Sequence, residues 1–166
     1  MTKTNVFDCN CPMARVTEVI GEPWTLMVLR EAFLGTRHFN EFERELGIAR
    51  NILSVRLRKL VEAGVLERLQ SETDRRSFEY RLTDSGRGLM PALVALAQWA
   101  GDCLCDGSTA TRFVERRTGR EIPAVAVRSA NGRVLDADEI AMVPGPDADE
   151  ALRARYQRVP AEARAR

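Results

Sequence analysis

The sequence predicts a mostly helical α+β fold with a small antiparallel hairpin. Apolar residues recur at helical spacing through most of the first 104 residues. Two short segments, "VLERL" at 65–69 and "SFEYRL" at 77–82, predict adjacent strands, and apolar and charged side chains alternate in the second. From about residue 107 the pattern changes to short β-prone segments between turn residues, which predicts a separate strand-rich extension.

Length and composition limit the class of protein. The chain has 166 residues, 45% hydrophobic and 30% charged, which is enough to bury a core. No apolar run of about 18 residues occurs, and the N-terminus lacks the apolar stretch of a signal peptide. We therefore expect a cytoplasmic protein with no membrane contact. The net charge is +1, so any basic surface must be local.

Three helices are expected first, at 13–20, 23–34 and 39–46. Gly21 separates the first two, and Pro23 suits the first turn of the second. For the third helix we expect Asn40 as the N-cap, with Glu43 completing a capping box.

A fourth helix is expected between Gly47 and Gly64, and its two sides differ in character. At 100° per residue, three leucines form one buried stripe: Leu53, Leu57 and Leu60. Six other positions of this helix are expected to face outward and to be available for binding: Arg50, Asn51, Ser54, Val55, Arg58 and Lys59. Arg56 points between the two sides, and either an ion pair with Glu41 or Glu45 or a contact with DNA would satisfy it.

The hairpin and the helix after it complete this part of the chain. The polar hairpin loop at 70–77 carries Arg75 and Arg76. Thr83 is expected to cap one long helix that runs to about residue 104, with Pro91 at a kink. The apolar side of this helix consists of Leu89, Leu93, Leu96, Trp99 and Ala100. It could form a dimer surface, or it could pack into the core of the same chain.

The chain is therefore expected to have three parts, at 1–106, 107–146 and 147–166. The first holds the helices and the hairpin. The second is the strand-rich extension, in which Asn131-Gly132 predicts a tight turn. The third is an Ala/Arg-rich tail that could begin with a helical turn or two and is expected to be partly disordered.

Two short helices joined at a glycine, followed by a hairpin, are typical of a winged helix-turn-helix. In that fold the second helix enters the DNA major groove, where arginine can bond guanine and asparagine can bond adenine. Arg75 and Arg76 would lie over phosphates or enter the minor groove. Residues 47–81 hold eight arginines and lysines against five carboxylates. The alternative is that these arginines only form a solvated surface.

Several short motifs occur together between residues 11 and 100: Cys11-Pro12, Gly21-x-x-Trp24, Arg37-x-Phe39-x-Glu41, Leu53-x-x-Arg56-Leu57-x-x-Leu60, Gly64 with Leu66, and Tyr80-x-Leu82-Thr83-x-x-Gly86. In these motifs the chain resembles the HxlR family of MarR-like bacterial winged-helix regulators. The resemblance implies a homodimer formed through terminal helices and a near-palindromic operator. It also implies oxidant or electrophile sensing at Cys11.

The chain departs from the family pattern at three places. Ala49 stands where the family usually has a capping serine, so that cap bond should be missing. Glu22 replaces a frequent glycine. The family pattern commonly ends near residue 105, so the resemblance does not explain the extension.

The cysteines form two C-x-C pairs, Cys9/Cys11 and Cys103/Cys105, and in a cytosolic chain they are expected to be free thiols. Cys11 is the candidate thiol sensor, against the simpler reading that small thiols pack in the core. A zinc site would need all four thiolates to converge, so we expect no metal and no cofactor. The lone His38 is expected at a helix start, and no catalytic motif is present.

The resulting prediction is a dimeric, sequence-specific DNA-binding transcriptional regulator, more simply a repressor than an activator, acting at the nucleoid on double-stranded DNA. It is not expected to be an enzyme. A thiol redox enzyme would need a βαβ pattern near one cysteine pair, which is missing. Two alternatives stay open: a ligand-responsive regulator without thiol sensing, and a winged-helix module that binds protein.

Overall fold

The structure is a computed structural model, and it describes residues 11–71, 76–105 and 109–158. The chain divides into two compact units. The first is Met1–Gly88 with Asp147–Asp149, and the second is Leu89–Pro146 with Glu150–Arg166. None of the helices in the described ranges is long and apolar enough to cross a bilayer.

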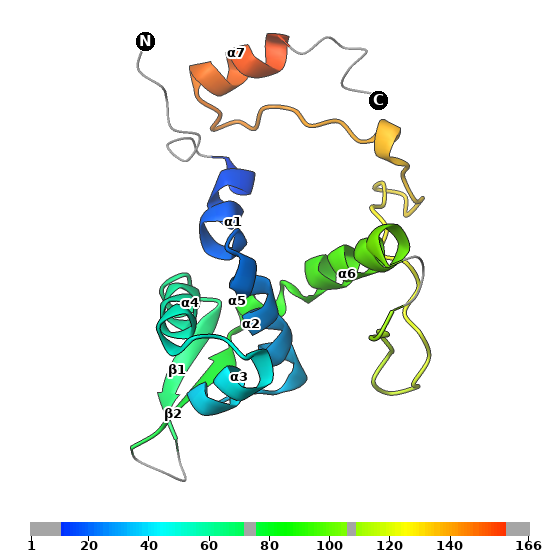
Figure 1. The fold of residues 1–166 in the computed structure, drawn as a ribbon. Coiled ribbons are helices and arrows are strands. Elements are labelled where there is room, and N and C mark those ends of the chain that lie inside the picture. Colours follow the sequence, from blue (N-terminus) through cyan, green and yellow to red (C-terminus); the bar gives the residue numbers. More distant parts are fainter. Residues whose placement is uncertain (1–10, 72–75, 106–108, 159–166) are drawn as a thin grey trace. The chain divides into compact units, whose positions relative to one another are not determined.

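The first unit contains five helices and one hairpin within its described residues (Figure 1). In chain order they are α1 (Pro12–Ile20), α2 (Pro23–Leu34), α3 (Phe39–Leu46), α4 (Arg50–Glu62), β1 (Leu66–Gln70), β2 (Phe78–Leu82) and α5 (Asp84–Arg87). The first four helices and both strands begin and end within a few residues of the predicted positions. A mostly helical fold with a small two-stranded antiparallel sheet is thereby confirmed.

The core of the first unit lies between α2, α3, α4 and the hairpin. Leu53, Leu57 and Leu60 of α4 have no exposed surface, which confirms the predicted leucine stripe. Phe42 of α3 is equally buried, and its ring meets Tyr80 of β2 edge-on with 6.4 Å between centroids. These contacts fix α4 to the domain by one side only, so its other side is left at the surface.

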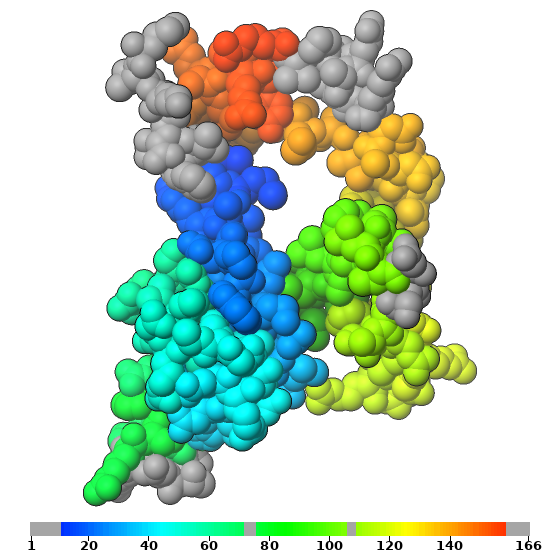
Figure 2. Space-filling model, in the orientation of Figure 1, coloured from blue at the N-terminus to red at the C-terminus, as the bar shows by residue number. Residues whose placement is uncertain are grey.

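The hairpin is antiparallel and pairs Leu66 with Leu82 at its base and Gln70 with Phe78 at its far end. This far end projects beyond the helices (Figures 1 and 2). The outer edge of β2 is held by the turn before α3, where the Tyr80 N–H donates to the Arg37 carbonyl at 2.8 Å. The hairpin is therefore anchored at both its base and its edge.

The start of α3 differs from the sequence prediction. The helix begins at Phe39, with His38 as the N-cap residue, so Asn40 and Glu43 are not the capping pair. Instead the Glu41 carboxylate accepts hydrogen bonds from the backbone N–H groups of His38, at 3.0 Å, and Arg37, at 3.2 Å. One side chain, three residues after His38 and four after Arg37, thus satisfies both backbone donors at the helix start.

The prediction of one long helix after Thr83 is also wrong, because this segment forms two separate helices. Thr83 does cap a helix, since its Oγ1 accepts from the Gly86 N–H at 3.0 Å. That helix, α5, ends at Arg87, and α6 (Met90–Leu104) starts afresh. Pro91 has no N–H to bond residue 87, and its ring would clash with that carbonyl in a continuous helix. In the first turn of α6 the same proline causes no loss.

The extension contains fewer strands than predicted. Residues 109–146 hold two isolated β-bridges, Val114 with Glu121 and Arg128 with Val134, and a single 3₁₀ turn, Ala137–Glu139. The turn at Asn131-Gly132 is confirmed, with Gly132 at φ +84°. No side chain in 109–146 is buried, so the β-prone segments have no layer to pack against.

The tail begins with a helix, as predicted. It is α7 (Glu150–Arg158), and the disorder expected further on concerns residues 159–166, which lie outside the described residues.

Candidate nucleic-acid interface

The outward side of α4 is polar and solvent-exposed. Arg50, Asn51, Ser54 and Arg58 are exposed, and Val55 and Lys59 are half-buried. The helix starts at Arg50 without a side-chain cap on Ala49, so the predicted loss of that bond is confirmed. The N–H groups of the first turn therefore receive no side-chain cap from Ala49 and remain available as donors.

Arg50 is held against α3. Its Nη1 lies 2.5 Å from the Glu43 carboxylate, and its guanidinium carbon lies 4.9 Å from the centroid of the Phe39 ring. The ring and the carboxylate fix the direction of the guanidinium at the corner between α3 and α4. The Glu43 carboxylate offsets part of the Arg50 charge, so a phosphate would have to share or displace this ion pair in order to bind Arg50.

Arg58 is much less constrained. Its closest carboxylate is Glu62, one turn on, at 3.9 Å, and both side chains are about two-thirds exposed, 67% and 66%. Such a pair contributes little in water. Asn51 and Ser54, next to it, make no side-chain hydrogen bond within the described part of the chain. These three side chains can therefore turn toward a ligand without breaking strong contacts.

Arg56 belongs to the interior, and its partner was not foreseen. Its Nη2 lies 3.0 Å from the Glu22 carboxylate, and only 14% of its side chain is exposed. The predicted partners Glu41 and Glu45 are both wrong. Glu22 stands where the family pattern frequently has glycine, and this departure was the one signal in the sequence that could have indicated the pair.

The hairpin carries three described arginines in different environments. Arg76 is exposed, whereas Arg75 lies outside the described residues. Arg81 bonds the Glu79 carboxylate through Nε at 3.0 Å and Nη2 at 2.7 Å, and this lowers the pKa of Glu79. Arg68 stacks on the Phe78 ring, 3.5 Å from its centroid. Sequence reasoning did not single out Arg68, because the stacking depends on the strand register.

The described cysteines lie at helix ends. Cys11 is half-buried at the N-cap of α1, whereas Cys103 and Cys105 are exposed near the end of α6, and none of the three is in a disulfide. Cys9 lies outside the described residues. Within the described ranges no three His, Cys, Asp or Glu side chains gather as metal ligands.

The second unit exposes one side of α6 and covers the other. Val94 is buried, and Gln98 on the same side bonds the extension: it donates to the Pro123 carbonyl at 3.2 Å and accepts from the Val125 N–H at 2.8 Å. At 100° per residue, Leu96 and Trp99 lie on the opposite side, and they are 48% and 56% exposed. Leu89, Leu93 and Ala100, also predicted for a dimer surface, are half-buried.

Residues 19–107 match the model of the HxlR-like helix-turn-helix family. The chain belongs to this family. Among its relatives is the HTH-type transcriptional regulator Rv3095 of Mycobacterium tuberculosis, 49% identical over 92 residues. That match covers 55% of this HxlR-family chain and 58% of the relative's length. The relative is named as a regulator of transcription, not as an enzyme.

Two solved structures extend the comparison. PA1607, assigned as a transcription factor, has a TM-score of 0.75 at 42% identity and covers 81% of this chain and 94% of its own. Because 81% exceeds the share of the chain that ends with α6, this likeness continues into the extension. The redox regulator HypR in its reduced form has a TM-score of 0.51 at 26% identity, covering 59% of this chain and all of its own.

Proposed function

We propose that this HxlR-family protein is a homodimeric, sequence-specific DNA-binding regulator that represses transcription from the operator it occupies. The observation that supports this most is the two-sided character of α4. Three fully buried leucines hold it to the domain, and its polar side, with Arg50 and Arg58 exposed, lies at the surface. A helix held in this way can enter the major groove, which is wide enough to admit it.

We assign the outward side chains of α4 to two kinds of DNA contact, according to how freely each can move. Arg58, Asn51 and Ser54 can reach base edges, and Val55 can contact a thymine methyl group. Arg50 and Lys59 are assigned to backbone phosphates, Arg50 because Glu43 and Phe39 already fix its direction. In the hairpin, Arg75 and Arg76 are assigned to phosphates or to the minor groove.

A homodimer is proposed because one helix-turn-helix reads about half of an operator, and two-fold symmetry places two such helices roughly 34 Å apart. The side of α6 that the extension does not bond is the proposed dimer surface, with Leu96 and Trp99 exposed on it. Such a dimer on a near-palindromic site would block polymerase without further machinery. It would act in the cytoplasm, at the nucleoid.

Thiol sensing at Cys11 is proposed as the trigger. Cys11 lies immediately before α1, as its N-cap residue, and the fold is similar to that of the redox regulator HypR. Oxidation of Cys11 would release DNA by shifting α1 or by bridging subunits. If Cys11→Ser protein leaves the operator under diamide as the parent does, Cys11 is not the trigger, and a small-molecule effector takes its place.

The proposed function is tested by a gel-shift assay on DNA that flanks the protein's own gene. The protein should bind one fragment in preference to random duplex, and binding should weaken steeply with salt. Arg58→Ala should remove the preference for that fragment. Equal binding to flanking and random DNA would instead favour a winged-helix module that binds protein. The exposed carboxylate of Glu62 on α4 supports that alternative.

A further inference from the structure

We propose that Arg68 and Phe78 form a phosphate clamp on the hairpin. In this clamp the Arg68 guanidinium binds a backbone phosphate of duplex DNA, and the Phe78 ring holds the Arg68 side chain in place. The inference rests on the proposed DNA-binding function and adds a contact that lies outside both α4 and the loop arginines.

The clamp is built by the strand register. Arg68 pairs across the hairpin with Tyr80, and Phe78 pairs with Gln70, so Arg68 and Phe78 are diagonal neighbours on one face of the sheet. The guanidinium carbon lies 3.5 Å from the centroid of the Phe78 ring. Phe78 is 39% exposed, and Arg68 is exposed as well. The pair therefore presents a cation at the surface in one fixed orientation.

Arg68 also keeps its charge. The other described strand arginine, Arg81, is bonded twice by Glu79, so its charge is largely offset. Within the described residues no carboxylate forms an ion pair with Arg68. Its neighbour Glu67 pairs with Arg81 in the register, on the opposite face of the sheet. Both arginines lie on the same hairpin and carry the same charge, but only Arg68 is available to bind an anion.

This arrangement suits a phosphate. Stacking occupies the flat face of the guanidinium and leaves its N–H edge free for a bidentate bond to an oxyanion. The ring holds the long side chain in one direction, so less side-chain entropy is lost when the anion binds. The hairpin packs directly against α4, so if α4 enters the major groove as proposed, the hairpin would come close to the phosphate backbone. Phosphate contacts fix the register of a protein on DNA.

The test compares three full-length variants by fluorescence anisotropy, on the preferred fragment and on random duplex, from about 50 to about 200 mM salt. Arg68→Gln should lower affinity on both DNAs and reduce the slope of log K against log salt by about 0.9, the value for one lost phosphate contact. Arg81→Gln is the matched control and should leave the slope unchanged. Phe78→Leu should keep the slope but weaken binding several-fold, because the charge stays while its fixed direction is lost.

The outcomes separate the clamp from the proposed function. If the parent protein binds no duplex DNA, the proposed function itself fails. If the parent binds and Arg68→Gln keeps both its affinity and its slope, the clamp is wrong and the regulator proposal stands. A loss confined to the preferred fragment would show that Arg68 reads bases, which also overturns the clamp. Circular dichroism and thermal melting of each variant check that it is folded.

Discussion

The winged helix and the extension are organised by different forces. In the winged helix, side chains from α2, α3, α4 and the two strands meet in an apolar core, with Val28, Leu29 and Phe42 fully buried. In residues 109–146 no side chain is buried. Several β-prone valines are present in both regions. A β-prone segment is stabilised as a strand where a second layer covers one face, and within the described residues no side chain of 109–146 is buried under such a layer.

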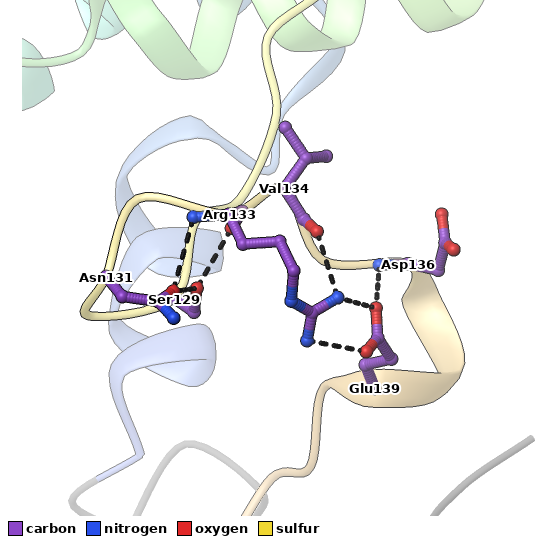
Figure 3. A network of polar contacts seen from close by, with 6 residues as sticks. All are labelled: Ser129, Asn131, Arg133, Val134, Asp136 and Glu139. Carbon is purple, nitrogen blue, oxygen red and sulfur yellow. Dashed lines mark hydrogen bonds and ion pairs between the residues drawn. The ribbon is translucent and has the colours of Figure 1, made fainter.

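Local polar contacts shape the extension instead (Figure 3). Arg133 bonds both oxygens of Glu139, at 2.9 and 2.7 Å, and Glu139 also accepts from the Asp136 N–H at 3.0 Å. Ser129 bonds Asn131 at 2.6 Å in the preceding turn. The ion pair raises the pKa of Arg133 and lowers that of Glu139. These groups are exposed, so water competes for every bond and the network sets local geometry rather than global stability.

The largest expected difference between the regions comes from truncating one apolar side chain in each. Leu57→Ala should lower the free energy of unfolding by about 2–5 kcal/mol, because it leaves a cavity under α4. Val127→Ala in the extension, where the side chain is 57% exposed, should change it by less than about 0.5 kcal/mol. Urea unfolding followed by circular dichroism measures both. Equal losses would contradict the contrast between the two regions.

Glycine substitutions should sharpen the same contrast. A Cβ at Gly86 would overlap the Val65 carbonyl oxygen, so Gly86→Ala should cost about 1–3 kcal/mol through overpacking at the start of α5. A Cβ at Gly145 would meet nothing within 4 Å, and Gly145→Ala should be neutral or slightly stabilising. Thermal unfolding of the two variants distinguishes them. A neutral Gly86→Ala would show that Val65 moves aside freely.

The ion pair of Arg56 and Glu22 should contribute less than the core. Glu22→Gln should lower stability by about 0.5–1 kcal/mol, since the Glu22 side chain is 44% exposed and water screens the pair. A double-mutant cycle with Arg56→Met isolates the coupling between the two side chains. Additive losses in that cycle would mean that Arg56 stabilises α4 by packing its hydrocarbon stem alone.

Acid should act on the winged helix through Glu41. The backbone N–H groups of His38 and then Arg37 hold the pKa of this carboxyl below its ordinary value. Its contribution to stability is therefore complete above the unfolded pKa of about 4.3 and is lost as the pH falls through the lower folded value. Glu41→Gln should be less stable than the parent at pH 7, and the difference should shrink below about pH 4. Unfolding curves from pH 7 to pH 3 measure this, and a constant difference would contradict it.

The smallest effect is expected from the exposed network of the extension. Arg133→Gln should leave the unfolding midpoint of the protein unchanged, because water replaces the bonds to Glu139. Hydrogen exchange should become faster only for the backbone amides near residues 133–139, which the network orders. A clear drop in the global midpoint would show that the extension supports the winged helix.

Much of the winged helix could be predicted because its signals are local. The leucine stripe of α4, the Thr83 cap and the uncapped Ala49 each depend on residues within a turn or two. The cap of α3 was placed two residues too late, since Asn40 and His38 both precede a glutamate by three residues. The outward set on α4 followed from periodicity, whereas its contacts with DNA stay a prediction.

The sequence by itself determined the order of helices and strands from α1 to β2 and the buried side of α4, because periodicity and capping act between close neighbours in the chain. Only the tertiary structure decided which arginines are engaged. Arg56 finds Glu22 thirty-four residues away, Arg68 finds Phe78 through the strand register, and Arg50 finds Glu43 across a helix corner. Charge can be counted along a chain, but its availability depends on packing that brings distant side chains together.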